Sequence, residues 1–157
     1  PSGIYDVAIA PMGESEFIYE ARLALVAGER YTIGAVPNVE TGGIMFQQVA
    51  EEQVELVAGE ARIAVMHSIP DLGPVNLVAN DAVLLQGLGF PGTFEGSDGY
   101  ASTDVVAGEY SLIVTDEAGN ELFDLGTLTL GAGRLYYVTF AGYAASAVYT
   151  LETLDAE

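Results

Sequence analysis

The sequence contains no cysteine, no tryptophan and no lysine, and its only basic residues are the arginines Arg22, Arg30, Arg62 and Arg134. The lack of cysteine excludes a disulfide scaffold, a thiolate zinc site and a cysteine nucleophile. Against these 4 basic residues stand 23 acidic ones, which gives a formal net charge of −19. A nucleic acid or an anionic membrane surface would be repelled, because binding either requires clustered Lys and Arg. We therefore expect no nucleic-acid partner.

Long apolar runs are also missing. No segment approaches the roughly 20 consecutive apolar residues that span a bilayer, so we expect no membrane insertion. The chain begins at Pro1 without a signal-peptide pattern, which suits either a processed chain or a piece of a longer one. An acidic surface without lysine is typical of proteins exposed to salt or to the outside, so we expect an extracellular or cell-surface location. A soluble acidic protein of another compartment fits the composition equally well.

Half of the residues are hydrophobic, which predicts a folded chain. Apolar side chains alternate with polar or small ones at period two along most of the sequence, the pattern of strands with one buried face. Turn-forming residues separate these segments, and 19 glycines are available for turns. The sequence therefore predicts an all-β fold, an antiparallel β-sandwich built from short strands.

An internal repeat lies in this pattern. Residues 3–36 align without a gap on residues 108–141, at an offset of 105. The identical positions are Gly3/Gly108, Tyr5/Tyr110, Glu16/Glu121, Leu23/Leu128, Leu25/Leu130, Ala27/Ala132, Gly28/Gly133 and Tyr31/Tyr136. The alternation and the turns coincide as well, so we interpret the two segments as copies of one unit.

The repeat predicts two domains of unequal completeness. Residues 59–157 are expected to form a complete β-sandwich, whereas 1–58 match only its back half. A sandwich without half of its strands exposes an apolar face and unpaired strand edges. Three explanations remain open: the chain is a fragment of a longer repeat protein, the first domain is shortened and closes on the second, or another chain supplies the missing strands. The last arrangement would produce head-to-tail polymers.

The second copy resembles a known family. Residues 61–71 read Ala-Arg-Ile-Ala-Val-Met-His-Ser-Ile-Pro-Asp and 74–77 read Pro-Val-Asn-Leu; 106–112 read Val-Ala-Gly-Glu-Tyr-Ser-Leu, and 128–138 read Leu-Thr-Leu-Gly-Ala-Gly-Arg-Leu-Tyr-Tyr-Val. These motifs are similar to those of the domain of unknown function 4397. The sequence departs from them at Ser68, Ile69 and Asn76 and in a longer loop at 86–104. One whole copy and the back half of another are covered.

The resemblance implies an immunoglobulin-like sandwich, often in tandem, in exported or cell-surface proteins, and it implies no known enzymatic activity. Such a likeness informs the fold more than the function.

His67 is the only histidine and hence the only ordinary general base. Its neighbour Ser68 would point to the opposite face of a strand, and Asp71 follows Pro70 in a turn. We interpret His67 as a side chain that binds loop backbone at a strand end, and we expect no enzyme. Gly87, Gly89 and Gly92 spell a dinucleotide-binding pattern, but Pro91 and the residues after it form no helix to hold a pyrophosphate.

The glycine-rich loop 86–104 offers the remaining candidates for binding. Glu95, Asp98 and Asp104 could contribute oxygen ligands to Ca²⁺, although their spacing is not that of an EF-hand and a solvated acidic loop is the simpler interpretation. We expect no other cofactor. Phe94 and Tyr100 are the candidate contact residues, because loops on a rigid sandwich carry recognition.

The predicted assembly strands are 4–10, 17–26, 30–36 and 44–49, and the side chains expected to mediate assembly are Tyr5, Val7, Ile9, Leu23, Leu25, Tyr31, Ile33 and Phe46. Together these features favour a non-catalytic structural or adhesive module of a secreted or cell-surface assembly. Its partners would be copies of itself or neighbouring repeats, joined into a filament by strand complementation. The alternative is an extracellular carbohydrate- or calcium-binding module that uses loop 86–104.

Overall fold

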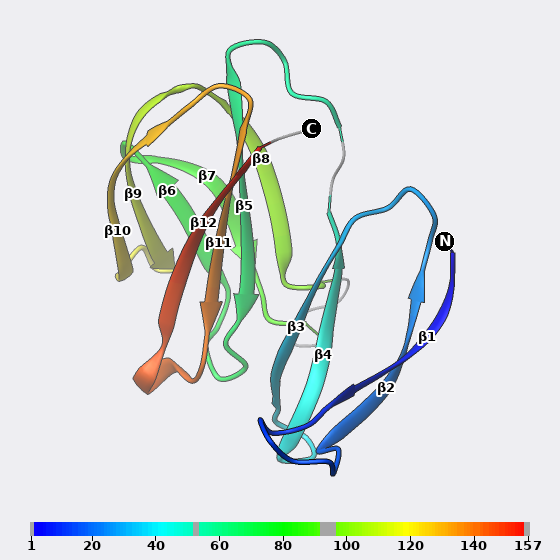
Figure 1. Ribbon diagram of the computed structural model, residues 1–157. Helices are drawn as coiled ribbons and strands as arrows, with labels where there is room; N and C mark the ends of the chain where they lie inside the picture. Colours follow the sequence, from blue (N-terminus) through cyan, green and yellow to red (C-terminus); the bar gives the residue numbers. More distant parts are fainter. Residues whose placement is uncertain (1, 52–53, 92–96, 156–157) are drawn as a thin grey trace. The chain divides into compact units, whose positions relative to one another are not determined.

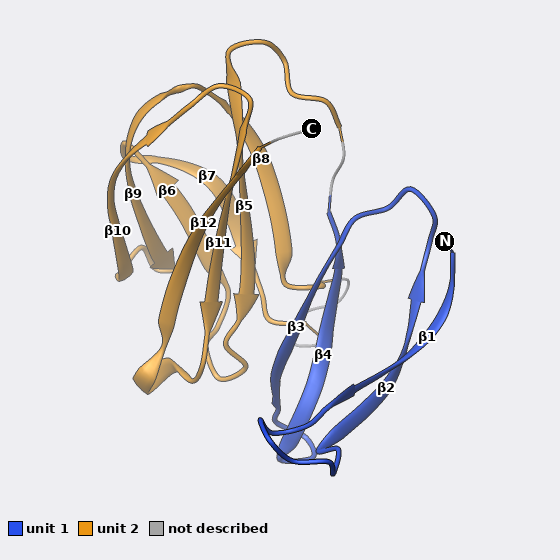
Figure 2. Ribbon diagram, in the orientation of Figure 1, with its two compact units in different colours: residues 1–53 blue, residues 54–157 orange. Residues whose placement is uncertain are grey.

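The computed structural model describes residues 2–51, 54–91 and 97–155. The chain divides into two compact units, residues 1–53 and 54–157, coloured separately in Figure 2. Strands are the main regular element of the described chain (Figure 1), and a single 3₁₀ turn, Ala144–Ser146, accompanies them. The all-β prediction is confirmed, and the fold is a β-sandwich.

The second unit is a sandwich of two four-stranded sheets. One sheet has the order β10-β9-β6-β7 and the other the order β12-β11-β5-β8. Their strands are β5 (Glu60–Ser68), β6 (Val75–Ala79), β7 (Ala82–Leu88), β8 (Tyr100–Val106), β9 (Gly108–Asp116), β10 (Glu121–Leu130), β11 (Arg134–Ala141) and β12 (Val148–Asp155). Every pairing is antiparallel except that between β5 and β11, which is parallel.

The core of the second unit lies between these sheets. Alternate residues of β5, β6, β9 and β11 point inward, as the period-two pattern requires. The buried cluster includes Ile63, Val65, Leu77, Leu112, Val114, Val138 and Phe140. Burying a side chain of this size stabilises the fold by roughly 1.5–3 kcal/mol. Phe140 also stacks on Phe123 of β10, with ring centroids 5.0 Å apart, so the aromatic pair joins the two sheets.

A two-residue turn connects β6 to β7. Asn80 and Asp81 both have positive φ, 47° and 65°, the backbone conformation of the tight turns that suit a twisted hairpin. Asn80 Oδ1 also accepts a hydrogen bond from Ser111 N–H at 2.9 Å, which ties the turn to β9. The turn thus places the hairpin beside the central strand of its sheet.

The first unit consists of two hairpins, each a two-stranded sheet. β1 (Gly3–Ile9) pairs with β2 (Tyr19–Leu25), and β3 (Tyr31–Asn38) pairs with β4 (Gly43–Ala50). Tyr19 of β2 meets Phe46 of β4 edge to face, with centroids 5.0 Å apart, and Gln48 donates a hydrogen bond to Ala24 O at 2.9 Å. These contacts hold the two hairpins together within the unit.

The structure has two strands that the sequence did not predict. β7 contains adjacent leucines and irregular pairing to β6, so its alternation is lost. β8 reads Tyr-Ala-Ser-Thr-Asp-Val-Val, which also lacks a clear period of two. The expectation that all of 86–104 is a loop is wrong, because 86–88 belong to β7 and Tyr100 and Asp104 lie in β8. The units divide at 53/54, close to the boundary at 58/59 expected from the sequence.

Candidate functional site

Each strand of the first unit has a counterpart in the second at the offset of 105. β1 and β2 correspond to β9 and β10, and the registers coincide where the hairpins open: Gly3 faces Leu25 as Gly108 faces Leu130. β3 corresponds to β11, and β4 spans 43–50 where β12 spans 148–155. The first unit therefore matches the strands β9–β12 of the second unit, strand for strand, and we call these four strands its rear half.

A tyrosine hydrogen bond repeats with the same offset. The Tyr31 hydroxyl accepts from Val26 N–H at 3.2 Å, and the Tyr136 hydroxyl accepts from Gly131 N–H at 2.8 Å. Both bonds tie the start of a strand to backbone five residues upstream, and Tyr136 also donates to Thr129 O at 3.2 Å. A tyrosine hydroxyl bound to upstream backbone is a recurrent feature of immunoglobulin-like sandwiches.

The equivalence of the fourth strands of the two units, β4 and β12, is not visible in the sequence. Residues 37–50 and 142–155 share no identical residue at this offset, so only the structure reveals that β4 and β12 are equivalent. Their pairing to the preceding strand differs by two residues: Tyr31 faces Ala50, whereas Tyr136 faces Thr153. A shift of two keeps every side chain on its original face.

The positions that form the core of the second unit are uncovered in the first. Val138 and Phe140 of β11 are 0% and 1% exposed, whereas their counterparts Ile33 and Ala35 of β3 are exposed, Ile33 by 40%. In β1, Tyr5 is 36% exposed, and its counterpart Tyr110 is half-buried. Val7 and Ile9 are half-buried while their counterparts Leu112 and Val114 are buried. The first unit thus presents an apolar face, which we call the open face and define as Tyr5, Val7, Ile9, Tyr31, Ile33 and Ala35.

The predicted assembly residues differ in burial. Leu23 is buried, and Leu25, Tyr31 and Phe46 are half-buried, since the two hairpins pack on each other along β2 and β4. In β3 and β4 the deepest side chains lie on the face opposite to the predicted one: Val36, Gln47 and Val49 are buried. The alternation identified strands correctly, but in this hairpin it named the less buried face, because no strands equivalent to β5–β8 lie against it in the first unit.

Two strand edges adjoin the open face. In the second unit β9 pairs with β10 and with β6, and β11 pairs with β12 and with β5. Among the described residues, β1 pairs with β2 alone and β3 with β4 alone. The backbone groups on the far sides of β1 and β3 are therefore the ones that β6-like and β5-like strands would satisfy.

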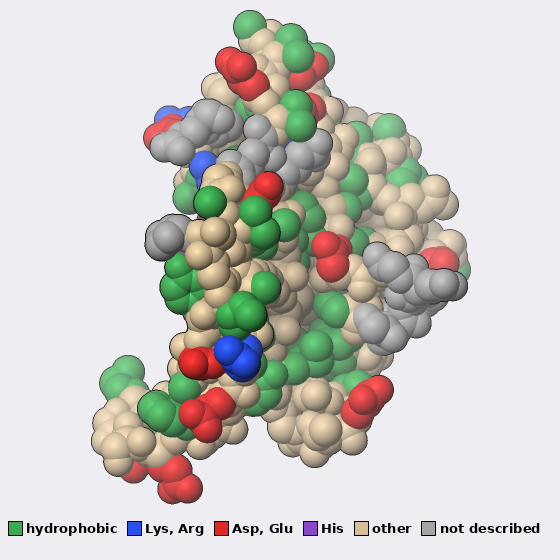
Figure 3. All heavy atoms as spheres, turned by 90° about the vertical axis from the view of Figure 1, so that its right-hand side faces the viewer, with side chains coloured by type: hydrophobic (Ala, Val, Ile, Leu, Met, Phe, Trp, Pro, Cys, Tyr) green, Lys and Arg blue, Asp and Glu red, His purple; other side chains and the backbone are tan. Residues whose placement is uncertain are grey.

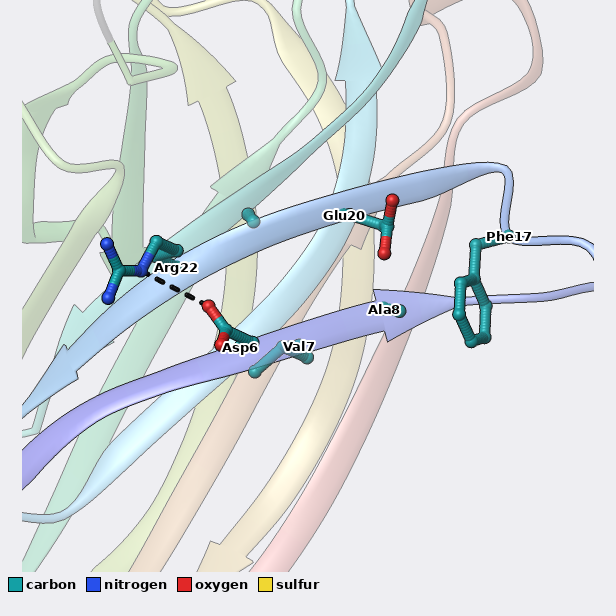
Figure 4. Close-up of a pocket in the computed structure, with 7 residues that line it drawn as sticks. Asp6, Val7, Ala8, Phe17, Glu20 and Arg22 are labelled. Carbon is teal, nitrogen blue, oxygen red and sulfur yellow. Dashed lines mark ion pairs between the residues drawn. The ribbon is translucent and has the colours of Figure 1, made fainter.

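A hollow lies along the β1–β2 hairpin (Figure 4). Asp6, Glu20 and Arg22 project there together with Val7, Ala8 and Phe17. Asp6 and Arg22 face each other across the hairpin and form an ion pair at 3.2 Å, but both side chains are largely exposed. Such a pair contributes little, and the hollow brings together no nucleophile and base. On the face drawn in Figure 3, hydrophobic side chains reach the surface between scattered acidic ones.

His67 is fully buried at the end of β5. Its Nδ1 accepts a hydrogen bond from Ile69 N–H at 3.2 Å, so Nε2 carries the proton and donates to Gly73 O at 3.1 Å. Burial lowers the pKa of His67, while the bond to Gly73 O opposes that shift in part. Asp71 accepts a hydrogen bond from Ala144 N–H at 2.8 Å. These are the contacts of a side chain that binds the loop after β5, as the sequence predicted.

The candidate calcium ligands have other contacts. Asp104 of β8 forms a two-point ion pair with Arg62 of β5, with N–O distances of 2.7 and 2.8 Å. Asp98 accepts from Tyr100 N–H at 3.0 Å. Glu95 lies outside the described residues, within which the His and acidic side chains form no cluster suited to a metal ion.

The candidate contact residue Tyr100 is likewise engaged in a contact within the second unit. Tyr100 stacks on Tyr137, with ring centroids 6.0 Å apart, and Phe94 lies outside the described residues. Of the glycine pattern, Gly87 has a positive φ of 68° in β7, and its N–H binds Asn76 Oδ1 at 2.9 Å. Among the described residues of 86–104, the contacts are those of the sandwich itself.

The fold and the open face define a β-sandwich protein in which one complete repeat accompanies a half repeat. No protein-family model matches the chain, and no curated protein matches it. A similar solved structure is the C-terminal domain of AlgF from P. aeruginosa, with 12% identity and a TM-score of 0.42, over 62% of this chain and 98% of that one. Within the described residues no helix is long and apolar enough to cross a membrane.

Proposed function

We propose that this protein is a non-catalytic structural or adhesive β-sandwich module of an extracellular assembly, joined to its neighbours by strand complementation at the first unit. One observation supports this most strongly: the open face and its two strand edges match surfaces that are covered in the second unit. Covering such a face stabilises a complex through burial of apolar surface and through main-chain hydrogen bonds.

The charge distribution suits this role. With a net charge of −19 the molecules repel one another, which keeps them soluble and opposes random aggregation through exposed edges. The open face itself carries no charged side chain, so association there requires no desolvation of a charge. An extracellular site and membership of the family that the sequence resembles are parts of this proposal.

The single histidine supports a role without acid–base catalysis. His67 is buried, both ring nitrogens bind backbone groups, and its lowered pKa favours the neutral form. A catalytic base requires access to a substrate proton.

The proposal is tested by association of the full chain. We expect sedimentation velocity to show concentration-dependent association of the native protein, and we expect Ile33→Asp to abolish it by placing a charge on the open face. The matched control is Val83→Asp, at an exposed position of β7 in the second unit. A native chain that stays monomeric at every concentration, or loses association equally with Val83→Asp, would contradict the proposal.

A further inference from the structure

The second unit shows which strands complete a rear half. β6 lies antiparallel to β9, with Leu77 opposite Val114 and Ala79 opposite Leu112. β5 lies parallel to β11, with Ile63 opposite Tyr136 and Val65 opposite Val138. β7 and β8 then extend the two sheets. The strands β5–β8 therefore form a front half that covers the rear half, β9–β12.

The strand count limits what can cover the open face. The described residues contain two rear halves, at 3–50 and 108–155, but one front half, which already lies in the second unit. A second copy that lent its front half would uncover its own β9 and β11. Copies of these 157 residues can therefore associate through their open faces, but they always leave rear halves without a front half, and completing the open face requires an additional one.

We propose that the open face binds a front half of the same repeat type from outside residues 1–157, with a β5-like strand parallel to β3 and a β6-like strand antiparallel to β1. This inference rests on the proposed function and specifies its partner. The offset of 105 fixes the register: the donor residue equivalent to Val65 lies opposite Ile33, and the one equivalent to Leu77 lies opposite Ile9.

The register also defines the chemistry of the donor. Its inward positions are apolar, since they meet Val7, Ile9 and Ile33 between two sheets. Ala35 replaces Phe140, a much larger side chain, so the open face leaves room for a larger donor side chain beside it than the complete repeat allows. A donor of this type completes both sheets at once, which a single added strand would not do.

Disulfide trapping tests the direction and the register, and the absence of native cysteine keeps it specific. The full chain carries Ile33→Cys, and the probe is a synthetic peptide of residues 59–70 carrying Val65→Cys. We expect it to cross-link about tenfold faster than a control peptide carrying Ala64→Cys, whose thiol points to the other face. Equal rates for the two peptides contradict the proposed register.

A fused chain tests the same inference when the free peptide aggregates. Residues 59–107 are joined directly to Gly3, because Ala107 precedes Gly108, the counterpart of Gly3. Amides of β1 and β3 that point away from β2 and β4 should then exchange about 100-fold more slowly than in the native chain. The control fusion carries Ile63→Asp and Leu77→Asp in the added segment and should give no protection.

The outcomes separate this inference from the proposed function. Unchanged exchange in the fused chain overturns the inference, even if the native chain still associates in an Ile33-dependent way and the proposed function stands. A native chain that forms a closed dimer with those amides protected identifies a second copy as the occupant and also overturns it. A native chain that neither associates nor responds to an added front half removes both.

Discussion

Arg62 and Asp104 illustrate how a partly buried charge is held in this sandwich. They lie opposite each other on β5 and β8, and the Arg62 side chain is 7% exposed. Neither the alternation nor the spacing indicated the pair, because the two residues are 42 positions apart and β8 was not predicted. Asp104 is thus better understood as a counter-ion than as a calcium ligand.

Removal of that counter-ion is expected to destabilise the second unit. Asp104→Asn should lower its free energy of unfolding by about 2–4 kcal/mol, because Arg62 keeps a buried charge without its carboxylate. The matched control is Asp6→Asn, which breaks the exposed pair with Arg22 and should cost less than about 1 kcal/mol. Urea unfolding measures both, and equal losses would contradict this account of Asp104.

The burial of His67 predicts that the free energy of unfolding of the second unit depends on pH. Because burial lowers its pKa in the folded state, the unfolded chain binds its proton more readily. The stability that neutral His67 contributes is therefore fully present above about pH 6.5, the ordinary pKa of histidine. It is lost as the pH falls toward the lower pKa of His67 in the folded state. Urea unfolding should show a free energy that declines below pH 6.5 by at most about 1.4 kcal/mol per pH unit.

The control for this dependence is His67→Gln, which cannot titrate in that range. We expect it to be less stable than the native chain at pH 7.5, since it loses the fit of the ring to Gly73 O and Ile69 N–H, but to show a flatter profile between pH 6.5 and 5. A variant with the native slope would show that other groups cause the decline.

At the scale of elements, alternation at period two marks the segments of every described strand except β7 and β8. The segments with clear alternation, such as β1, β9 and β11, were correctly placed because their apolar residues recur at period two. β7 and β8 escaped detection because bulged pairing and small or polar residues remove the period. The open face was partly foreseen from the half repeat, and a strand was expected at 44–49. The equivalence of β4 to β12 was not foreseen, because the two strands share no identical residue at the offset of 105, and neither was the buried face of β3–β4.

Matched truncations test the contrast between the two units. Val138→Ala should destabilise the second unit by about 2–3 kcal/mol, because it opens a cavity in a closed core. Ile33→Ala, at the equivalent position of the first unit, should cost less than about 1 kcal/mol, because Ile33 is already 40% exposed. Thermal unfolding of both variants measures the difference, and equal losses would mean that Ile33 lies in a core of its own.

The β6–β7 turn offers a stabilising substitution. Asp81 has a φ of 65°, which costs energy for any residue but glycine. Asp81→Gly creates the Asn-Gly pair preferred at such turns and should raise the unfolding midpoint by an amount corresponding to about 0.5–1 kcal/mol. Asn80→Gly is the control: it relieves a similar strain but loses the bond to Ser111 N–H, so it should gain less. A loss of stability with Asp81→Gly would contradict this view of the turn.

At the scale of the whole molecule, the chain contains one finished sandwich and one rear half. The same strand set occurs in both units with the same hairpin register at its start and the same tyrosine hydrogen bond. What differs is the set of strands equivalent to β5–β8. The proposed function and the proposed donor both follow from that difference.

Hydrogen exchange of the native chain in dilute solution tests this difference most directly. Amides of β9 and β11 that bond to β6 and β5 should be protected to nearly the full stability of the second unit, and the equivalent amides of β1 and β3 should exchange at least about 100-fold faster. Equal protection of the equivalent amides in the two units would show that the first unit is closed by its own residues, and the account would be wrong.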